Sequence, residues 1–312
     1  MAFKNGQGRL AMLMLAIGLG GTQPAAGTPP SLSGTDDAPP VTAIAPQAAP
    51  AATSEPDPEQ GTVADGVYFN GYFGLSYALP PGWVKGLDGP PPSNAGLYVL
   101  SSLDGPGDAR PSMLIVAQDL FFGAKPFASI SDAAGDFRAS IAAVPGMTID
   151  LDPAAIRIAG HDFLRIDYHA GGLYRVWLAT ELRCHLLMFN ITATDQTTAG
   201  QVALGLATMS LPAADDATEG STLPVCIKDY VTPQALVRRV DPLPVGPAFL
   251  KLPVRIIIGR DGHVRHVHLI SGFPEQRRAI EEALVQWQFR PPEVRGRPIE
   301  VETGLIFQFK PQ

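Results

Sequence analysis

Residues 251–310 contain the pattern that most constrains how this chain can fold, because the period of the apolar residues changes along it. Residues 251–258 (KLPVRIII) are rich in β-branched side chains, and residues 263–270 (HVRHVHLI) alternate as a returning strand would. Asp261-Gly262 between them is typical of a hairpin, since glycine adopts positive φ without steric cost. An antiparallel hairpin is therefore predicted here.

A helix and a long strand are predicted after the hairpin. Across residues 274–287 the apolar residues recur on one helix face, and Pro274 suits the first turn, where its missing N–H has no cost. Pro291-Pro292 ends this pattern, and residues 299–310 (IEVETGLIFQFK) alternate again. The tail is thus predicted to be a small β-β-α-β unit that binds rather than catalyses.

The tail resembles the TonB C-terminal domain family over about residues 231–309. The motifs that carry the resemblance are, in order, Val254-Arg-Ile-Ile-Ile258, Asp261-Gly262, Ser271-Gly272 with Pro274, Trp287-Gln-Phe289-Arg-Pro291 and Gly296-Arg-Pro298. The chain departs from the family at Leu243-Pro244, where Tyr-Pro is usual.

The resemblance implies a periplasmic module that contacts outer-membrane transporters by strand addition, in which main-chain hydrogen bonds give the affinity. It also implies inner-membrane motor proteins as partners if the N-terminal segment stays in the membrane. The same edge could pair two copies as a homodimer. The final strand is the expected partner-binding edge, with residues Ile299, Val301, Thr303, Leu305, Phe307 and Phe309.

Residues 67–212 are predicted to form an α+β domain, an antiparallel sheet with helices packed on it, and residues 213–230 to be a linker. A helix is expected at 129–144, and Asp195 is expected to cap a closing helix at 196–209. The opening motif Phe73-Gly74-Leu75-Ser76-Tyr77-Ala78-Leu79-Pro80-Pro81-Gly82-Trp83 and the order of elements resemble the PsbP-like sandwich fold. Strands are expected at 67–79 (two, around Asn70-Gly71), 97–103, 112–118, 148–158, 161–169, 173–181 and 184–192.

Residues 1–27 have the order of a secretory signal peptide: Lys4 and Arg9, an apolar run at 10–19, then small residues. The run is short for a bilayer-crossing helix, although a short membrane anchor remains an alternative. Residues 28–66 are dominated by Pro, Ala, Thr, Ser and Asp, which predicts a disordered linker. The sequence therefore predicts export to the periplasm of a bacterium, with possible retention at the inner membrane.

The charge distribution bears on nucleic-acid binding, and the two cysteines bear on a possible disulfide. The net charge of −7 is uneven, because the residues from Cys226 onward carry an excess of Lys and Arg over Asp and Glu. No nucleic-acid-binding motif accompanies this excess, so no nucleic-acid partner is predicted. Cys184 and Cys226 are the only cysteines, and in an oxidising compartment they could form a disulfide; the alternative is two free thiols.

No motif predicts catalysis, a cofactor or a metal, and the protein is not expected to be an enzyme. His266 and His268 share one strand face, with His263 or Glu282 as a conceivable third metal ligand, but histidines on a half-exposed strand more often bind nothing. Asp167 and His169 also share a strand face, without any nucleophile beside them.

Two functions follow from these patterns. The first is a TonB-like protein that binds outer-membrane transporters and supports energy-dependent transport across the envelope. The alternative is a secreted periplasmic binding or scaffold protein that uses the same tail without motor coupling. A mature N-terminus near Gly27 would exclude motor coupling.

Overall fold

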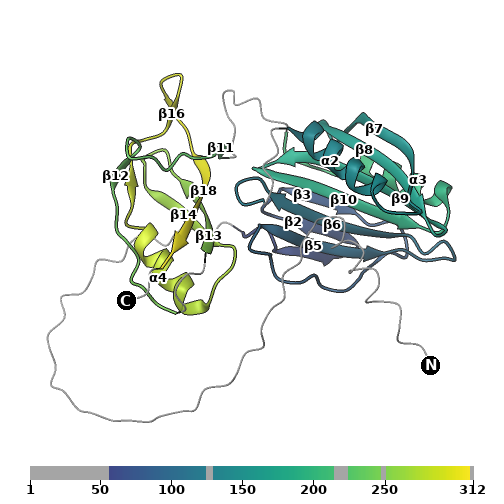
Figure 1. Ribbon diagram of the computed structural model, residues 1–312, viewed down its shortest axis with the longest axis horizontal. Coiled ribbons are helices and arrows are strands. Elements are labelled where there is room, and N and C mark those ends of the chain that lie inside the picture. Colours follow the sequence, from purple (N-terminus) through teal and green to yellow (C-terminus); the bar gives the residue numbers. More distant parts are fainter. Residues whose placement is uncertain (1–55, 124–128, 214–223, 247–250, 310–312) are drawn as a thin grey trace, which may run out of the picture. The chain divides into compact units, whose positions relative to one another are not determined.

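The computed structural model describes residues 56–123, 129–213, 224–246 and 251–309. It confirms the predicted α+β class, with mostly antiparallel sheets and few helices (Figure 1). The described residues belong to one compact unit, which contains two hydrophobic cores. We call residues 56–213 the sandwich module and residues 224–309 the tail module. The predicted signal peptide and most of the predicted linker lie outside the described residues.

The sandwich module contains a three-stranded and a seven-stranded antiparallel sheet. The small sheet has the order β1-β2-β3, and β1 lies before the predicted domain start at residue 67. The large sheet has the order β4-β5-β6-β10-β9-β8-β7. The strands are β1 (Gly61–Ala64), β2 (Val67–Asn70), β3 (Leu75–Ala78), β4 (Val84–Lys85), β5 (Leu97–Asp104), β6 (Ser112–Asp119), β7 (Thr148–Ile158), β8 (His161–Ala170), β9 (Leu173–Leu182) and β10 (His185–Ala193).

Helices cover both faces of the large sheet. On one face, the small sheet and the helix α3 (Gln196–Gly205), with the 3-10 turn η1 (Leu206–Thr208), enclose the core; buried Tyr77 and Phe189 belong to it. Asp195 caps α3 as predicted, since its carboxylate accepts a hydrogen bond from the Thr198 N–H. On the other face lies the helix α2 (Ile130–Ala142), where Phe137 stacks on Trp177.

The tail module contains a four-stranded sheet with the order β11-β18-β13-β14. The helix α4 (Pro274–Leu284) and Trp287 cover one face of this sheet, and their apolar side chains form the second core. No helix among the described residues is long and apolar enough to cross a membrane. The strands are β11 (Val225–Cys226), β12 (Leu236–Arg238), β13 (Lys251–Ile258), β14 (Val264–Leu269), β15 (Gln288–Phe289), β16 (Glu293–Val294), β17 (Arg297–Pro298) and β18 (Val301–Gln308).

The predicted hairpin turn at Asp261-Gly262 joins β13 to β14. Gly262 has a φ of +82°, and its carbonyl accepts a hydrogen bond of 2.8 Å from the N–H of Phe289. A Cβ atom at this position would lie 2.1 Å from the carbonyl oxygen of Phe289. Glycine is therefore required here by the approach of β15 as well as by the backbone angle.

We predict that Gly262→Ala destabilises the protein more than Gly296→Ala, although both glycines have positive φ. Gly296 has open space where a Cβ would be, so its replacement should cost about 1–2 kcal/mol from backbone strain alone. Gly262→Ala must also displace Phe289, and should cost more. Urea unfolding of the two variants measures the difference, and equal losses would contradict this account of the turn.

Candidate functional site

The face of the tail sheet opposite α4 is covered by the sandwich module. Arg255 of β13 and Glu302 of β18 lie on this face, and their side chains are each 2% exposed. A Cβ added to Gly304 would lie 2.7 Å from Phe122 and 2.8 Å from Phe121, both from the sandwich module. This face of the tail sheet is thus buried around Arg255 and Glu302, while Ile306 farther along β18 is exposed.

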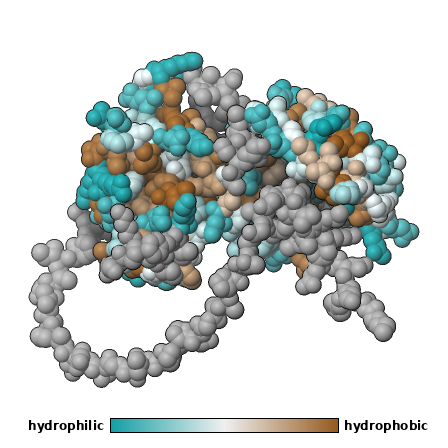
Figure 2. Space-filling view, viewed as in Figure 1, coloured by the Kyte–Doolittle hydropathy of each residue, from teal (hydrophilic) through white to brown (hydrophobic). Residues whose placement is uncertain are grey.

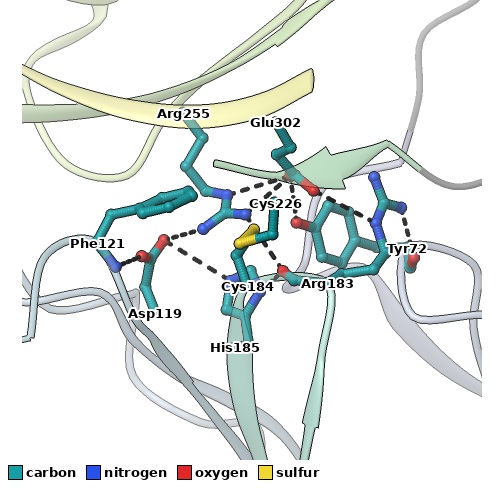
Figure 3. Close-up of a disulfide and its surroundings, with 9 residues drawn as sticks. All are labelled: Tyr72, Asp119, Phe121, Arg183, Cys184, His185, Cys226, Arg255 and Glu302. Carbon is teal, nitrogen blue, oxygen red and sulfur yellow. Dashed lines mark hydrogen bonds and ion pairs between the residues drawn. A yellow bond between two sulfur atoms is a disulfide. The ribbon is translucent and has the colours of Figure 1, made fainter. Parts of the chain in front are cut away.

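Arg255 connects carboxylates from the two modules (Figure 3). Its Nη1 donates a hydrogen bond of 2.5 Å to Asp119 at the end of β6, and its Nη2 lies 2.9 Å from Glu302 Oε1. The guanidinium also lies over the ring of Phe121, 4.8 Å from the centroid. Planar guanidinium groups suit such buried pairs, because several donors and a weakly hydrated face act together.

Glu302 is also held by the sandwich module. The Tyr72 hydroxyl donates a hydrogen bond of 2.5 Å to Glu302 Oε1, and the Nε of Arg183 lies 3.6 Å from Oε2. Arg183 in turn lies over the Tyr72 ring, 3.9 Å from its centroid, and donates to the Tyr72 carbonyl. We call Tyr72, Asp119, Arg183, Arg255 and Glu302 the buried charge cluster.

The buried charge cluster balances two guanidinium groups against two carboxyl groups. Burial alone would lower the pKa of Arg255, but Asp119 and Glu302 raise it well above its usual range. Burial would likewise raise the pKa of Glu302, but Arg255 and Arg183 bring it below its usual value. For Asp119, burial outweighs the attraction of Arg255, so its pKa is raised. His185, fully buried beside them, has its pKa lowered by burial and by Arg255.

A strained hairpin tip positions part of this cluster. Arg183 and Cys184, between β9 and β10, have φ of 49° and 57°, which is the backbone of a turn that favours glycine or asparagine. Each such residue costs about 1–2 kcal/mol. Both side chains make contacts that offset this cost, since Arg183 pairs with Glu302 and Cys184 is joined by a disulfide to Cys226.

The disulfide joins β11 of the tail sheet to the turn between β9 and β10 of the sandwich module. Cys226 belongs to β11, inside the segment 213–230 that was predicted to be a linker, and β11 pairs in parallel with Val301 and Glu302 of β18. The cysteines are 42 residues apart, and closing a loop of that length stabilises the folded state by about 4 kcal/mol in the chain-entropy model.

The predicted edge strand is therefore corrected in two respects. First, β18 is the outermost strand only after Glu302, because β11 pairs with its beginning. Second, Val301, Thr303, Leu305 and Phe307 do not provide the edge: the register with β13 directs their main-chain groups inward. Most of the predicted edge side chains, including Ile299 and Phe309, pack in or against the tail core.

The main-chain groups at the open edge belong to the alternate residues. The carbonyls of Glu300 and Glu302 accept hydrogen bonds from the N–H groups of Val225 and Ile227, so these carbonyls point away from β13. By alternation, the N–H and C=O groups of Gly304, Ile306 and Gln308 point the same way. No described strand pairs with them, and Ile306 is 56% exposed.

The residues that the sequence analysis weighed for acid–base chemistry or metal binding do not belong to this edge. Asp167 forms a bidentate pair with Arg165, and His169 lies 2.8 Å from Asp150, so Asp167 and His169 do not form an acid–base pair with each other. Glu282 pairs with Arg278 on α4.

His266 and His268 lie beside carboxylates, but these do not include Glu282, the carboxylate considered from the sequence. Asp57 and Glu59, which precede β1, lie beside them, while Glu282 and His263 are absent from this group. Burial would raise the pKa of Asp57, yet the neighbouring His266 and His268 lower it below its usual value.

Comparisons with known proteins give similarity in fold only. No protein-family model matches the chain, and no curated protein matches its sequence. Cyanobacterial PsbP from Synechocystis sp. PCC 6803 is similar with a TM-score of 0.35 and 13% identity, over 47% of this chain and 91% of that one. LpqN of Mycobacterium tuberculosis, involved in cell envelope biogenesis, is similar with a TM-score of 0.30 and 12% identity, over 44% of this chain and 83% of LpqN. Both TM-scores are low, and neither similarity assigns a function.

We predict that Arg255→Met lowers the free energy of unfolding by about 3–5 kcal/mol, because it leaves Asp119 buried without its cation and leaves Glu302 with Arg183 alone. Arg265→Met is the matched control, since Arg265 pairs with Glu300 on the same sheet but is 53% exposed. The control should cost no more than about 1 kcal/mol. Equal losses in denaturant unfolding would show that Arg255 does not hold the two modules together.

Proposed function

We propose that this protein is an exported envelope protein that binds an extended segment of an outer-membrane transporter by strand addition to β18. The observation that carries the proposal is the open edge formed by the main-chain groups of Gly304, Ile306 and Gln308. Such groups accept an added strand, with each hydrogen bond contributing about 0.5–1.5 kcal/mol. The resemblance of the tail to the TonB C-terminal domain family supports the class of partner and the role in energy-dependent transport.

The position of β11 supports the same mode of binding. β11 already pairs with the first two residues of β18, so a strand of the partner would continue the sheet where β11 ends. On the face shown in Figure 2, hydrophobic residues lie among hydrophilic ones. The disulfide supports export, since such bonds persist in oxidising compartments such as the periplasm.

A second candidate function is a secreted periplasmic scaffold that binds a partner strand without motor coupling. The cross-links between the modules favour it. Arg255 and the Cys184–Cys226 disulfide fix the tail against the sandwich module, as suits a rigid binding platform. Both candidates use the same edge, and they differ in whether the N-terminal segment stays in the inner membrane.

We predict that Ile306→Pro abolishes capture of an outer-membrane transporter by the full chain. Proline removes the N–H that points toward the partner, but no hydrogen bond to β13, so the tail should still fold. The measurement is affinity capture from solubilised outer membranes, with the captured proteins identified by mass spectrometry.

Ile306→Thr is the matched control, because it keeps the N–H and a β-branched side chain. It should capture the same transporter as the original protein. Capture that is unchanged in Ile306→Pro would contradict strand addition at this edge, and capture of another copy of this chain would indicate a homodimer instead.

A further inference from the structure

A second cluster of polar side chains lies between the start of the sandwich module and the tail sheet. His266 and His268 are two residues apart on β14, so their side chains project from the same face as Arg255 and Glu302. Asp57 and Glu59 approach this face from the segment before β1. One oxygen of each carboxylate and one nitrogen of His268 all lie within 4.8 Å of one another.

Three of these atoms, one from each of Asp57, Glu59 and His268, lie near enough to one another to surround a single ion. His268 Nδ1 lies 2.8 Å from Asp57 Oδ1. Glu59 Oε2 lies 3.4 Å from the other ring nitrogen, Nε2, and one ion can bind only one nitrogen of the ring. In a tetrahedral zinc site with ligand bonds of about 2.0–2.1 Å, neighbouring ligand atoms are about 3.3 Å apart. Side-chain rotations that close separations of up to 4.8 Å to about this value would bring the three side chains to ligand distance.

The polar atoms of this cluster do not satisfy one another. The His268 side chain is 2% exposed, yet neither of its ring nitrogens makes a hydrogen bond of acceptable geometry. Glu59 Oε2 and His266 Nε2 are buried and equally unpartnered. Each buried polar group without a hydrogen bond destabilises the folded state by about 1–3 kcal/mol. A cation bound by the lone pairs of these nitrogen and oxygen atoms would remove that destabilisation.

The donor set selects the kind of cation. Two carboxylates and a neutral imidazole place two negative charges around the position, which suits a divalent ion. Imidazole nitrogen with carboxylate oxygen favours zinc and similar transition metals over magnesium or calcium, which take oxygen ligands. Asp57 is 27% exposed and Glu59 33%, so water could reach a fourth position.

We propose that Asp57, Glu59 and His268 bind a divalent transition metal such as Zn²⁺, with water as the fourth ligand and His266 beside Asp57. The ion ties the segment before β1 to β14. It is thus a third connection between the modules, besides the disulfide and the buried charge cluster. The proposal is independent of the open edge of β18, because β13 lies between β18 and β14 in the sheet.

The test is calorimetric titration of ZnCl₂ into the full chain, free of any histidine tag and stripped with a chelator. We expect one site with a dissociation constant in the micromolar range or tighter, and no comparable heat with MgCl₂. Glu59→Gln should weaken zinc binding by about tenfold or more, and His268→Ala should remove it. His169→Ala is the matched control, because His169 also lies beside an aspartate, Asp150, but on the sandwich sheet.

The outcomes decide the proposal in either direction. Zinc binding that is lost in His268→Ala, weakened in Glu59→Gln and unchanged in His169→Ala supports it. Binding no tighter than millimolar in the original protein overturns it, and means that His268 only pairs with the two carboxylates. Equal affinity in Glu59→Gln and the original protein also overturns it. If His268→Ala fails to fold, Glu59→Gln decides, since its side chain is a third exposed.

Discussion

A guanidinium buried to 2% exposure cannot discard its charge, and this constraint organises the contact between the two modules. Arg255 stands in the buried part of β13, among apolar residues, so the carboxylates that neutralise it must be buried as well. One comes from the neighbouring strand of its own sheet, at Glu302, and the other from the sandwich module, at Asp119. Arg255 and Glu302 balance each other within the tail, and Asp119 and Arg183 add a second pair of opposite charges from the sandwich module. The contacts of the buried charge cluster are therefore complete only when the sandwich module covers this part of the tail sheet.

This arrangement determines which surface remains for a partner. One face of the tail sheet packs against α4, and the other packs against Phe121, Phe122 and the buried charge cluster. The strand β11 pairs with the beginning of β18, and the disulfide joins β11 to the sandwich module. After Glu302, the outward main-chain groups of β18 are not paired with any described strand. We infer that a partner is recognised through backbone hydrogen bonds to these groups.

The long elements follow from the sequence because each has one dominant periodicity. The strands β13 and β18 and the capped helix α3 lie close to their predicted ranges. The very short strands β11 and β12 were not predicted, since two or three residues carry no periodicity and pair only when distant strands reach them. The edge was assigned to the wrong alternate residues because outward main-chain direction depends on the register with β13.

The buried charge cluster was also not predicted, because its members are far apart in the chain. Two local signals could have indicated it. One is a single arginine inside the apolar run KLPVRIII, and the other is Arg183-Cys184 in a turn too tight for most residues with side chains. Neither signal could have identified Asp119 or Glu302 as the partners, because that requires the packing of one module on the other.

Amide hydrogen exchange along β18, measured by NMR on the free protein, tests the central claim most directly. The account predicts slow exchange at Thr303, Leu305 and Phe307, whose N–H groups bond to β13, and much faster exchange at Gly304, Ile306 and Gln308. A transporter segment that adds as a strand should slow the second set and leave the first unchanged. Equally slow exchange at all six residues in the free protein would contradict the account, because it would show that the edge is already occupied.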